Sequence, residues 1–447
     1  MALKITVIGT GYLGATHAAA MAELGFEVLA LDVVREKIEK LERAEAPMYE
    51  PGLEELLRKH VAGIEGSSGR LRFTQDWAEL GAFGDVHFVC VNTPQRHGEY
   101  ACDMSYVDSA FASLAPHLHG PALVVGKSTV PVGSADRLAT YLAAHAPAGE
   151  DAELAWNPEF LREGFAVDDT LHPDRLVVGV RSERAEKLLR EVYATPIAEG
   201  SPFVVTDFPT SELVKTSANS FLATKISFIN AMAEVCEAAG GDVAKLAEAI
   251  GYDDRIGRKF LRAGIGFGGG CLPKDIRAFM ARAGELGADQ ALTFLREIDS
   301  INMRQRGQMV ELTRQALGGG SFLGKRVAVL GATFKPDSDD VRDSPALNVA
   351  GQIHLQGGQV TVYDPKGMDN ARSVFPTLGY ADSALDAVRG ADIVLHLTEW
   401  REFRELDTEA LGEVAAARVI LDGRNALDPE LWRKAGWTYR AMGRPRA

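Results

Sequence analysis

Short, mainly apolar segments without strict alternation of apolar and polar residues are separated by helix-forming stretches in two parts of the chain. In the first part, from Leu3 to about Asp207, the runs cover residues 5–8, 28–31, 86–91 and 123–126. In the second part, which begins at Gly324, they cover residues 327–330, 360–363, 393–397 and 419–421. Strands that are apolar throughout and alternate with helices are typical of a parallel sheet buried on both faces. The pattern therefore predicts two α/β units.

A long helix is predicted between these units. The segment from Ser211 to about Ala239 contains neither Pro nor Gly, and its apolar residues recur at steps of three and four, which is the helical period. At 1.5 Å per residue such a helix spans roughly 40 Å. Ser211 is a candidate N-cap and Gly240-Gly241 a natural end. We expect a rigid spacer that also forms a dimer interface.

The composition narrows the class of protein. A chain of 447 residues with 46% hydrophobic and 25% charged residues suits two or three globular domains and excludes disorder as the main state. The net charge of −14 disfavours nucleic acid and anionic membranes as partners, so a phosphate ligand must be held by local cations and backbone amides. No apolar run reaches the ~18 residues of a membrane helix, and the first residues lack a signal-peptide pattern.

The four cysteines show neither close pairing nor metal-ligand spacing. That usage fits a reducing compartment and argues against structural zinc. The sequence therefore predicts a cytoplasmic protein that has no membrane span and no metal site.

A glycine pattern follows the first strand. Gly9, Gly11 and Gly14 form G-x-G-x-x-G between that strand and a helix, and the next strand ends at Asp32, eighteen residues after Gly14. Gly9 permits the tight turn, Gly11 lets the backbone approach a pyrophosphate, and Gly14 lets the helix pack on the strand. Asp32 is expected to accept hydrogen bonds from ribose hydroxyls and to repel a 2′-phosphate, which favours NAD over NADP. Lys37 is interpreted as a solvated helix residue with an occasional ribose contact.

The second α/β unit lacks this fingerprint. After its first strand the chain reads Gly-Ala-Thr-Phe-Lys-Pro (331–336), without a second or third glycine. Asp364 ends its second strand, as Asp32 does in the first unit. We expect a copy of the fold that binds another ligand or none. The predicted architecture is α/β, with two Rossmann-like parallel-sheet domains (1–206 and 324–447) joined by a helical domain (207–300) and a linker (301–323).

A second glycine-rich segment leads to a cysteine. Five glycines within residues 264–270 precede Cys271, and Pro273 marks the start of a helix. A thiol just ahead of a helix N-terminus, with Lys274 beside it, is stabilised as a thiolate. Cys271 is therefore a candidate nucleophile, although a lone cysteine is more often an inert core residue. Cys90 and Cys236 are interpreted as packing residues.

Together these motifs resemble the UDP-glucose 6-dehydrogenase family over essentially the whole chain. The resemblance rests on the following segments: GTGYLG (9–14), VNTP (91–94), GKSTVPVG (126–133), NPEFLREG (157–164), the helix with Lys215 and Asn219, GFGGGCLPKD (266–275), FKPDSDDVRDSP (334–345) and DGR (422–424). GDP-mannose dehydrogenase shares several of them, but the helix at 215–230 resembles the UDP-glucose branch. Gly270 departs from many relatives, which carry a side chain there.

The resemblance implies a four-electron oxidation of UDP-glucose to UDP-glucuronate with NAD. It implies Cys271 as the nucleophile, Lys215 and Asn219 as stabilisers of oxyanion charge, and Asp275 and Glu159 as proton acceptors. Thr129 is expected to hold a catalytic water, although a turn-stabilising hydroxyl is an equally ordinary role. The base of the first step stays open.

The resemblance also implies the binding residues. On the cofactor side they are Gly9, Gly11, Tyr12, Leu13, Gly14, Asp32, Lys37, Thr93, Ser128, Thr129, Glu163 and Arg342. On the substrate side they are Glu159, Phe160, Leu161, Arg162, Lys215, Asn219, Arg255, Arg262, Gly268, Phe334, Lys335 and Arg424. Arg255 is expected to reach the site of the second subunit of a homodimer built on the long helix, and Glu163 could equally be a surface acid.

Three alternatives remain at this point. The chain could oxidise another nucleotide sugar, such as GDP-mannose or UDP-N-acetylmannosamine. It could be a non-catalytic sensor of NAD or a nucleotide sugar, although a binder does not require Cys271, Lys215, Asn219 and Asp275 together. A one-hydride hydroxyacid dehydrogenase has a similar helical spacer but needs neither the cysteine nor a third domain.

Overall fold

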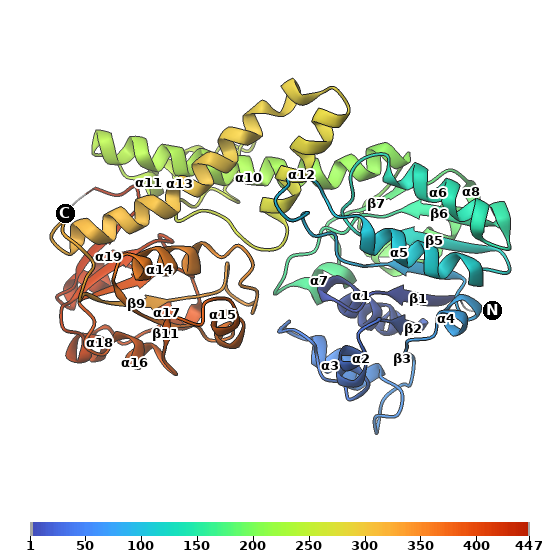
Figure 1. Ribbon diagram of the computed structural model, residues 1–447, viewed down its shortest axis with the longest axis horizontal. Coiled ribbons are helices and arrows are strands. Elements are labelled where there is room, and N and C mark those ends of the chain that lie inside the picture. The colour runs from blue at the N-terminus through green and yellow to red at the C-terminus, as the bar shows by residue number, and fades with distance from the viewer. Residues whose placement is uncertain (1–2, 446–447) are drawn as a thin grey trace. The chain divides into compact units, whose positions relative to one another are not determined.

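The computed structural model describes residues 3–445. The chain folds into two compact units (Figure 1). The first unit extends to Ala218 and also takes in Arg277–Glu285, and the second comprises Asn219–Ile276 and the chain from Leu286 onward. Each unit contains one sheet, so the two predicted α/β units are confirmed. The four domain ranges given by the sequence stay a prediction.

The sheet of the first unit has eight strands in the order β3-β2-β1-β4-β5-β6-β7-β8. All neighbouring strands run parallel except β6 and β7, which meet antiparallel where Trp156 lies opposite Gly179. Because β1 lies between β2 and β4, the strand order reverses there, and the carboxyl ends of such strands form the usual ligand crevice. The strands are β1 (Lys4–Ile8), β2 (Glu27–Leu31), β3 (Leu71–Thr74), β4 (Val86–Val89), β5 (Ala122–Gly126), β6 (Ala152–Trp156), β7 (Leu176–Gly179) and β8 (Phe203–Thr206).

Helices connect these strands, and apolar side chains are buried on both faces of the sheet. Along β2, Val28 and Ala30 belong to one apolar cluster while Leu29 and Leu31 belong to another, which is the reason that four consecutive residues of the strand are apolar. The helices are α1 (Tyr12–Glu23), α2 (Arg35–Glu42), α3 (Leu53–His60), α4 (Trp77–Phe83), α5 (Ser105–Leu114), α6 (Ser134–His145), α7 (Ala166–Leu171), α8 (Glu183–Val192) and α9 (Ala194–Ala198).

The sheet of the second unit has six parallel strands in the order β11-β10-β9-β12-β13-β14. Its first strand, β9, lies between β10 and β12, just as β1 lies between β2 and β4. The strands are β9 (Arg326–Leu330), β10 (Gln359–Tyr363), β11 (Gly379–Tyr380), β12 (Ile393–His396), β13 (Val419–Asp422) and β14 (Thr438–Ala441). Its connecting helices are α14 (Pro345–Leu355), α15 (Met368–Val374), α16 (Ala384–Val388), α17 (Arg401–Arg404), α18 (Thr408–Val414) and α19 (Pro429–Lys434).

The long helix α10 covers Phe208–Ala239 and is continuous (Figure 1). It begins three residues before Ser211, so the predicted N-cap is wrong. The carboxylate of Asp207 instead accepts a hydrogen bond from the backbone amide of Thr210 at 2.7 Å, and Pro209 lies in the first turn, where no backbone donor is needed. Gly240, with φ of +76°, ends the helix as expected.

Three further helices complete the chain: α11 (Val243–Gly251), α12 (Leu272–Glu285) and α13 (Thr293–Ala316). Residues up to 316 of the expected linker at 301–323 therefore form the second part of α13. Among the residues that the structure describes, no helix combines the length and the apolar character needed to cross a bilayer.

Candidate active site

The glycine pattern after β1 forms a tight turn into α1. Gly9 has φ of +88°, a conformation that side chains other than glycine rarely adopt. A Cβ atom on Gly14 would lie 1.7 Å from the carbonyl oxygen of Gly9, so only glycine allows the helix to start this close to the strand. At Gly11 the nearest heavy atom to an added Cβ, the Oδ1 atom of Asn92, is 3.8 Å away, which leaves the backbone accessible. The turn therefore suits a pyrophosphate at the start of a helix.

Asp32 lies beside this turn at the end of β2. Its carboxylate accepts hydrogen bonds from the amide and hydroxyl of Thr10 at 2.8 and 2.9 Å, and from the amide of Val34 at 2.9 Å. The ammonium of Lys37 is 3.6 Å from the same carboxylate. Asp32 thus connects the end of β2 to the glycine turn, which is the position required for a ribose acceptor.

Asp364, the equivalent aspartate of the second unit, is surrounded by more hydrogen-bond donors. Six donors converge on the carboxylate of Asp364, four on one oxygen and two on the other, and they include the indole of Trp400 and both the amide and the hydroxyl of Thr333. A Cβ atom on Gly331 would lie 2.4 Å from the hydroxyl oxygen of Thr398. Protein atoms therefore occupy the place of a dinucleotide turn, which agrees with the missing fingerprint.

A charged pair in the first unit joins two of the expected catalytic residues. The ammonium of Lys215, on α10, lies 3.0 Å from the carboxylate of Glu159, which follows β6, and the two side chains are only 5% and 13% exposed. The other carboxylate oxygen of Glu159 accepts the amide of Leu161 at 2.7 Å. The ring of Phe160 lies 5.6 Å from the Lys215 ammonium. Because the pair is largely shielded from water, its two charges interact strongly.

Two buried carboxylates hold the loops around this pair, and the sequence had not identified either. Glu50 accepts the amides of Gly164 and Ala166, both at 2.7 Å, and so fixes the end of the 157–164 segment. Glu212, one turn before Lys215 on α10, accepts the amides of Gly133 and Ala135, both at 2.7 Å. Burial raises the pKa of Glu212, while these backbone hydrogen bonds oppose the rise.

The remaining residues expected near the cofactor have mixed surroundings. The hydroxyl of Tyr12 accepts the amide of Gly164 at 2.7 Å, and Ser128 donates its hydroxyl to the carbonyl of Val91 at 2.7 Å. Thr93 and Glu163 are buried. Arg162, which was expected on the substrate side, is exposed and forms an ion pair with Asp169.

In the second unit, Cys271 is exposed and stands directly before α12. Asp275 lies in the first turn of that helix, and its amide donates to the carbonyl of Cys271 at 2.9 Å. The Asp275 carboxylate is 2% exposed; one oxygen accepts the amide nitrogen of Asn219 at 2.7 Å, and the ammonium of Lys274 lies 2.6 Å from the other. The structure thus brings Asn219 and Asp275 together at the start of the helix that Cys271 precedes.

The glycines before Cys271 are required by close packing. A Cβ atom on Gly266 would lie 2.3 Å from the Oδ1 atom of Asn302, and one on Gly268 would lie 2.3 Å from the carbonyl oxygen of Asp343. The buried side chain of Asn302 also bonds both the amide and the carbonyl of Phe267. Asn302 therefore holds the loop in place. The signal for this role in the sequence is a polar residue in the interior of helix α13.

Gly270, the residue directly before Cys271, is required by a close contact. A Cβ atom there would lie 2.3 Å from the guanidinium carbon of Arg342. Arg342, expected on the cofactor side, forms a bidentate ion pair with Asp340 in the second unit. Gly270 thus allows this guanidinium to lie against the backbone next to Cys271.

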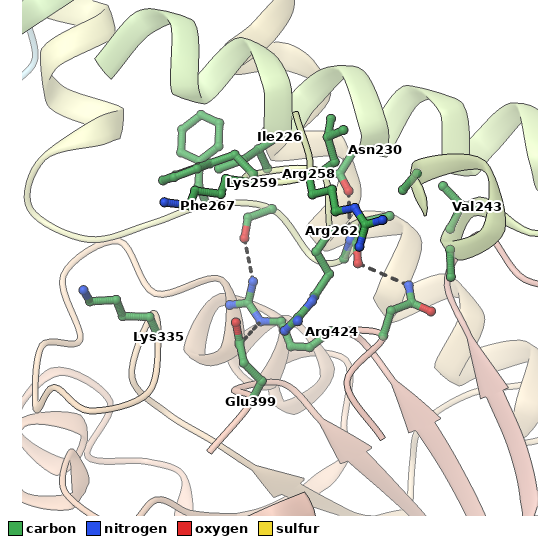
Figure 2. A pocket seen from close by; sticks show the side chains of 18 of the residues that line it. Ile226, Asn230, Val243, Arg258, Lys259, Arg262, Phe267, Lys335, Glu399 and Arg424 are labelled. Carbon is green, nitrogen blue, oxygen red and sulfur yellow. Dashed lines mark hydrogen bonds and ion pairs between the residues drawn. The ribbon is translucent and has the colours of Figure 1, made fainter. Parts of the chain in front are cut away.

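A cavity of about 670 Å³ opens in the second unit, and Figure 2 shows its lining. Arg262, Lys335 and Arg424, which the resemblance assigns to the substrate, line it together with Gly268 and Phe334. Arg258 and Lys259 also line it, although the sequence had not singled them out. A cavity of this size with five cationic side chains suits a nucleoside diphosphate.

Arg424 has a second task in this cavity. Its guanidinium donates to the carbonyls of Leu397, Gly266 and Phe334 at 2.8, 2.8 and 3.1 Å, and Glu399 lies 3.5 Å away. It therefore ties three loops of the second unit together. Arg255 does not line the cavity; it is strongly exposed and pairs with Asp253.

The chain matches one family along nearly its whole length. Residues 3–197 match the NAD binding domain of the UDP-glucose/GDP-mannose dehydrogenase family, residues 209–304 its central domain and residues 328–429 its UDP binding domain. The chain is 41% identical over 445 residues to the UDP-glucose 6-dehydrogenase of Rhizobium meliloti, with 99% of this chain and 100% of the relative covered.

Solved structures show the same similarity. The UDP-glucose dehydrogenase from Pyrobaculum islandicum is 35% identical with a TM-score of 0.89, covering 99% of this chain and 98% of that one. The UDP-D-ManNAc dehydrogenase from Pyrococcus horikoshii is 27% identical with a TM-score of 0.86, and both chains are fully covered. The NAD cofactor and the two-sheet fold expected from the sequence are thereby confirmed.

Replacing Asp32 tests the ribose contact. Asp32→Ala removes charged hydrogen-bond acceptors and the repulsion of a 2′-phosphate, so the Kd of NADH should rise on the order of 10- to 100-fold and the preference over NADPH should fall. Fluorescence titration with both nucleotides measures the two effects. Asp108→Ala, at a partly exposed aspartate of the same unit, is the control and should change neither Kd. Unchanged affinity and preference in Asp32→Ala would mean that the ribose contact is misassigned.

Proposed function

Because the chain belongs to the UDP-glucose/GDP-mannose dehydrogenase family, we propose that it oxidises the C6 hydroxymethyl group of UDP-glucose to a carboxylate. The reaction removes four electrons as two hydrides, and NAD accepts one hydride in each step. The observation that carries this proposal is the exposed Cys271 thiol at the start of α12, next to an aspartate held between Asn219 and Lys274.

The thiol is needed because an aldehyde is a poor hydride donor. The Cys271 thiolate adds to the aldehyde carbon and forms a thiohemiacetal, whose C–H bond can then release the second hydride. The resulting thioester is cleaved by water, which regenerates the thiol and yields the carboxylate. The intermediate stays covalently bound, so no free aldehyde needs to leave the protein.

The charged residues suit the other parts of this chemistry. Lys215 stabilises negative charge on the reacting oxygen, and Asn219, one turn further along α10, contributes an amide donor to the same task. Glu159 and Asp275 accept protons during oxidation and hydrolysis, and Thr129 holds the attacking water. The ion pair of Glu159 with Lys215 supports Glu159 as a proton acceptor, because a proton can pass between partners 3.0 Å apart.

The cavity of the second unit supports a nucleotide sugar as the substrate. Arg262, Lys335 and Arg424 offer cations to a diphosphate in a protein whose net charge is −14. The match of residues 328–429 to a UDP binding domain, together with 41% identity to the UDP-glucose 6-dehydrogenase of Rhizobium meliloti, supports a uridine nucleotide. UDP-N-acetylmannosamine is the second candidate, favoured by the similarity to the Pyrococcus horikoshii structure.

We also propose a homodimer in the cytoplasm. Phe221, Phe228 and Val235 follow one another at seven-residue steps along α10, and their exposed fractions are 67%, 47% and 57%. Seven residues are close to two helical turns, so these side chains form one apolar stripe, which a second copy of the helix can cover. Arg255 is then free to reach the substrate of the second subunit. The four cysteines, which show no close pairing along the sequence, suit a reducing compartment.

The stoichiometry of the reaction tests the four-electron assignment. We expect two NADH for each UDP-glucose consumed, measured by absorbance of NADH and by chromatography of the sugar nucleotides. UDP-N-acetylmannosamine and GDP-mannose are assayed in parallel to separate the candidate substrates. A ratio of one to one with every sugar nucleotide would contradict the proposal.

Replacing Cys271 tests the covalent route. Cys271→Ala should lower UDP-glucuronate formation by at least ~10³-fold, since only the covalent step makes the aldehyde a hydride donor. Binding of NAD and UDP-glucose, measured by calorimetry, should stay within about twofold. Cys102→Ala, at another cysteine that is not fully buried, is the matched control. Normal product formation by Cys271→Ala would rule out the thioester.

The dimer is tested on the helix stripe. Phe221→Asp combined with Phe228→Asp places two charges on the apolar surface and should shift the molar mass in light scattering from two chains to one. Leu355→Asp, at an apolar residue of α14 that is 87% exposed, should leave the mass unchanged. A wild-type protein that is already a monomer at micromolar concentration would contradict the dimer.

A further inference from the structure

The proposed reaction has to release protons from a buried place, and this inference rests on that proposed function. Oxidation of the hydroxymethyl group with two NAD and one water yields the carboxylate, two NADH and three protons. Glu159 and Lys215 are almost fully covered, so a proton that Glu159 accepts needs a further group to carry it away. That carrier should itself change protonation near neutral pH.

A small second cavity in the first unit connects Glu159 with such a group. Its volume is about 50 Å³, and it is lined by Glu159 and by four buried polar side chains, Lys127, His17, Asn157 and Tyr193. The exposed Asp174 also lines it. The cavity therefore extends from the neighbourhood of the buried ion pair to the surface of the same unit.

Lys127 lies at the carboxyl end of β5 and has few partners for an ammonium group. Its Nζ atom donates to the Oδ1 atom of Asn157 at 3.0 Å and to the hydroxyl of Tyr193 at 3.3 Å, and the ring of Phe88 lies 5.7 Å away. The Tyr193 hydroxyl donates to the same Asn157 oxygen at 2.6 Å. Asn157 and Tyr193 would thus satisfy each other without Lys127, so hydrogen bonding within the core gives no reason for a lysine here.

Of the groups around Lys127 whose pKa is shifted, the lysine is the one whose pKa moves towards neutral pH. The charged side chains of Asp169, Asp174 and Arg175 also line the cavity. Burial lowers the pKa of Lys127 to about 8, while Cys90 and Glu159 oppose the shift. Burial and the Lys127 charge hold the pKa of His17, on α1, well below its usual value. Burial raises the pKa of Cys90, after β4, to about 12 and that of Tyr193, between α8 and α9, above its ordinary value. His17 is therefore neutral, and Cys90 and Tyr193 stay protonated.

The cavity also contains polar atoms that suit water. Both ring nitrogens of His17 are buried and have no hydrogen-bond partner among the described residues. Buried polar atoms of this kind are normally satisfied by water, and the cavity volume is sufficient for it. Water in this cavity would connect Glu159 and Lys127, which both line it, along a path that a proton can follow.

We propose that Lys127 is a relay residue, which takes the proton from Glu159 and passes it through this cavity to solvent. In the transfer the O–H bond of the protonated Glu159 carboxyl breaks and an N–H bond forms on the neutral Lys127 amine. The ammonium then gives its proton to water in the cavity, and the amine is restored for the next oxidation step. Lys127 acts through Glu159 and touches neither the sugar nor the nicotinamide.

Lys127→Met tests the relay because methionine keeps the length of the side chain and removes the amine. The kcat of the wild type should rise with pH through about 8, as Lys127 loses its proton, whereas Lys127→Met should lack this rise. At pH 8.5 its kcat should be about 10- to 100-fold lower, while both KM values stay within about twofold. Adding methylamine should restore the rate in proportion to its concentration, because a small base can replace a proton carrier.

Two variants serve as controls. Lys187→Met changes an exposed lysine of the same unit, whose side chain is 77% exposed, and should behave as the wild type. Tyr193→Phe removes a hydrogen-bond partner but keeps the amine, so the pH-dependent rise should remain. A normal pH profile in Lys127→Met, or a loss of rate that methylamine does not restore, would overturn the relay.

A stability measurement checks Lys127 without any assay of activity. The folded pKa of about 8 is below the ordinary 10.5, so unfolding takes up a proton between these values and the wild type becomes more stable as pH rises through this window. The stability advantage of Lys127→Met in urea unfolding should therefore be greatest below pH 8. The ratio of the unfolding equilibrium constants of the wild type and Lys127→Met should fall by roughly 100-fold between pH 8 and pH 10.5. A constant difference would show that Lys127 is not neutralised in the fold.

The same experiments separate the two proposals. If the wild type forms no NADH from any sugar nucleotide while the unfolding constants converge with pH, the proposed function fails and the titration of Lys127 stands, which leaves the relay without a reaction and overturns it. If the wild type forms two NADH per UDP-glucose and Lys127→Met behaves as the wild type, the relay fails alone.

Discussion

A carboxylate that is removed from water must collect hydrogen-bond donors or cations, and this requirement positions several segments of the candidate site. Glu50 collects the amides at the end of the 157–164 segment, and Glu212 collects the amides at the start of α6. Asp275 is held by the amide of Asn219 and the ammonium of Lys274. Since an unsatisfied buried charge costs several kcal/mol, each loop has one strongly preferred position.

The two sheets have similar topologies but differ at the aspartate that follows the second strand of each. In both units the first strand lies between the second and the strand that reverses the order, and an aspartate ends the second strand. Asp32 holds an open glycine turn, whereas Asp364 is surrounded by six donors and the adjoining space is filled by Thr398 and Trp400. The second sheet keeps the fold and offers its cationic cavity to a different ligand.

Buried charges in this protein are justified by chemistry more readily than by stability. The ammonium of Lys127 and the pair of Lys215 with Glu159 lie where apolar side chains would cost less free energy. Each of these groups can hold or move a proton at a defined atom. The burial that makes them costly also brings the pKa of Lys127 close to neutral pH, which water would not do.

Local spacing in the sequence determined the strands, the glycine turn with Asp32 and the exposed Cys271 ahead of a helix, because each depends on neighbours within a few residues. The roles of Gly266, Gly268 and Gly270 needed the tertiary structure, since Asn302, Asp343 and Arg342 press against them from distant segments. The start of α10, in contrast, is determined locally, because the Asp207 carboxylate accepts the amide of Thr210 three residues later.

Only the folded chain revealed Glu50, Glu212 and Lys127. Glu50 bonds residues 114 and 116 positions away, and Glu212 residues 77 and 79 positions away, so no periodicity connects them. Lys127 stands in a segment that the sequence marked as a family motif, but its burial depends on α1, β4, β6 and α8 packing around it. The sequence determines which residues carry a charge. The exclusion of solvent from those residues, which sets their pKa and their reactivity, is a property of the whole fold.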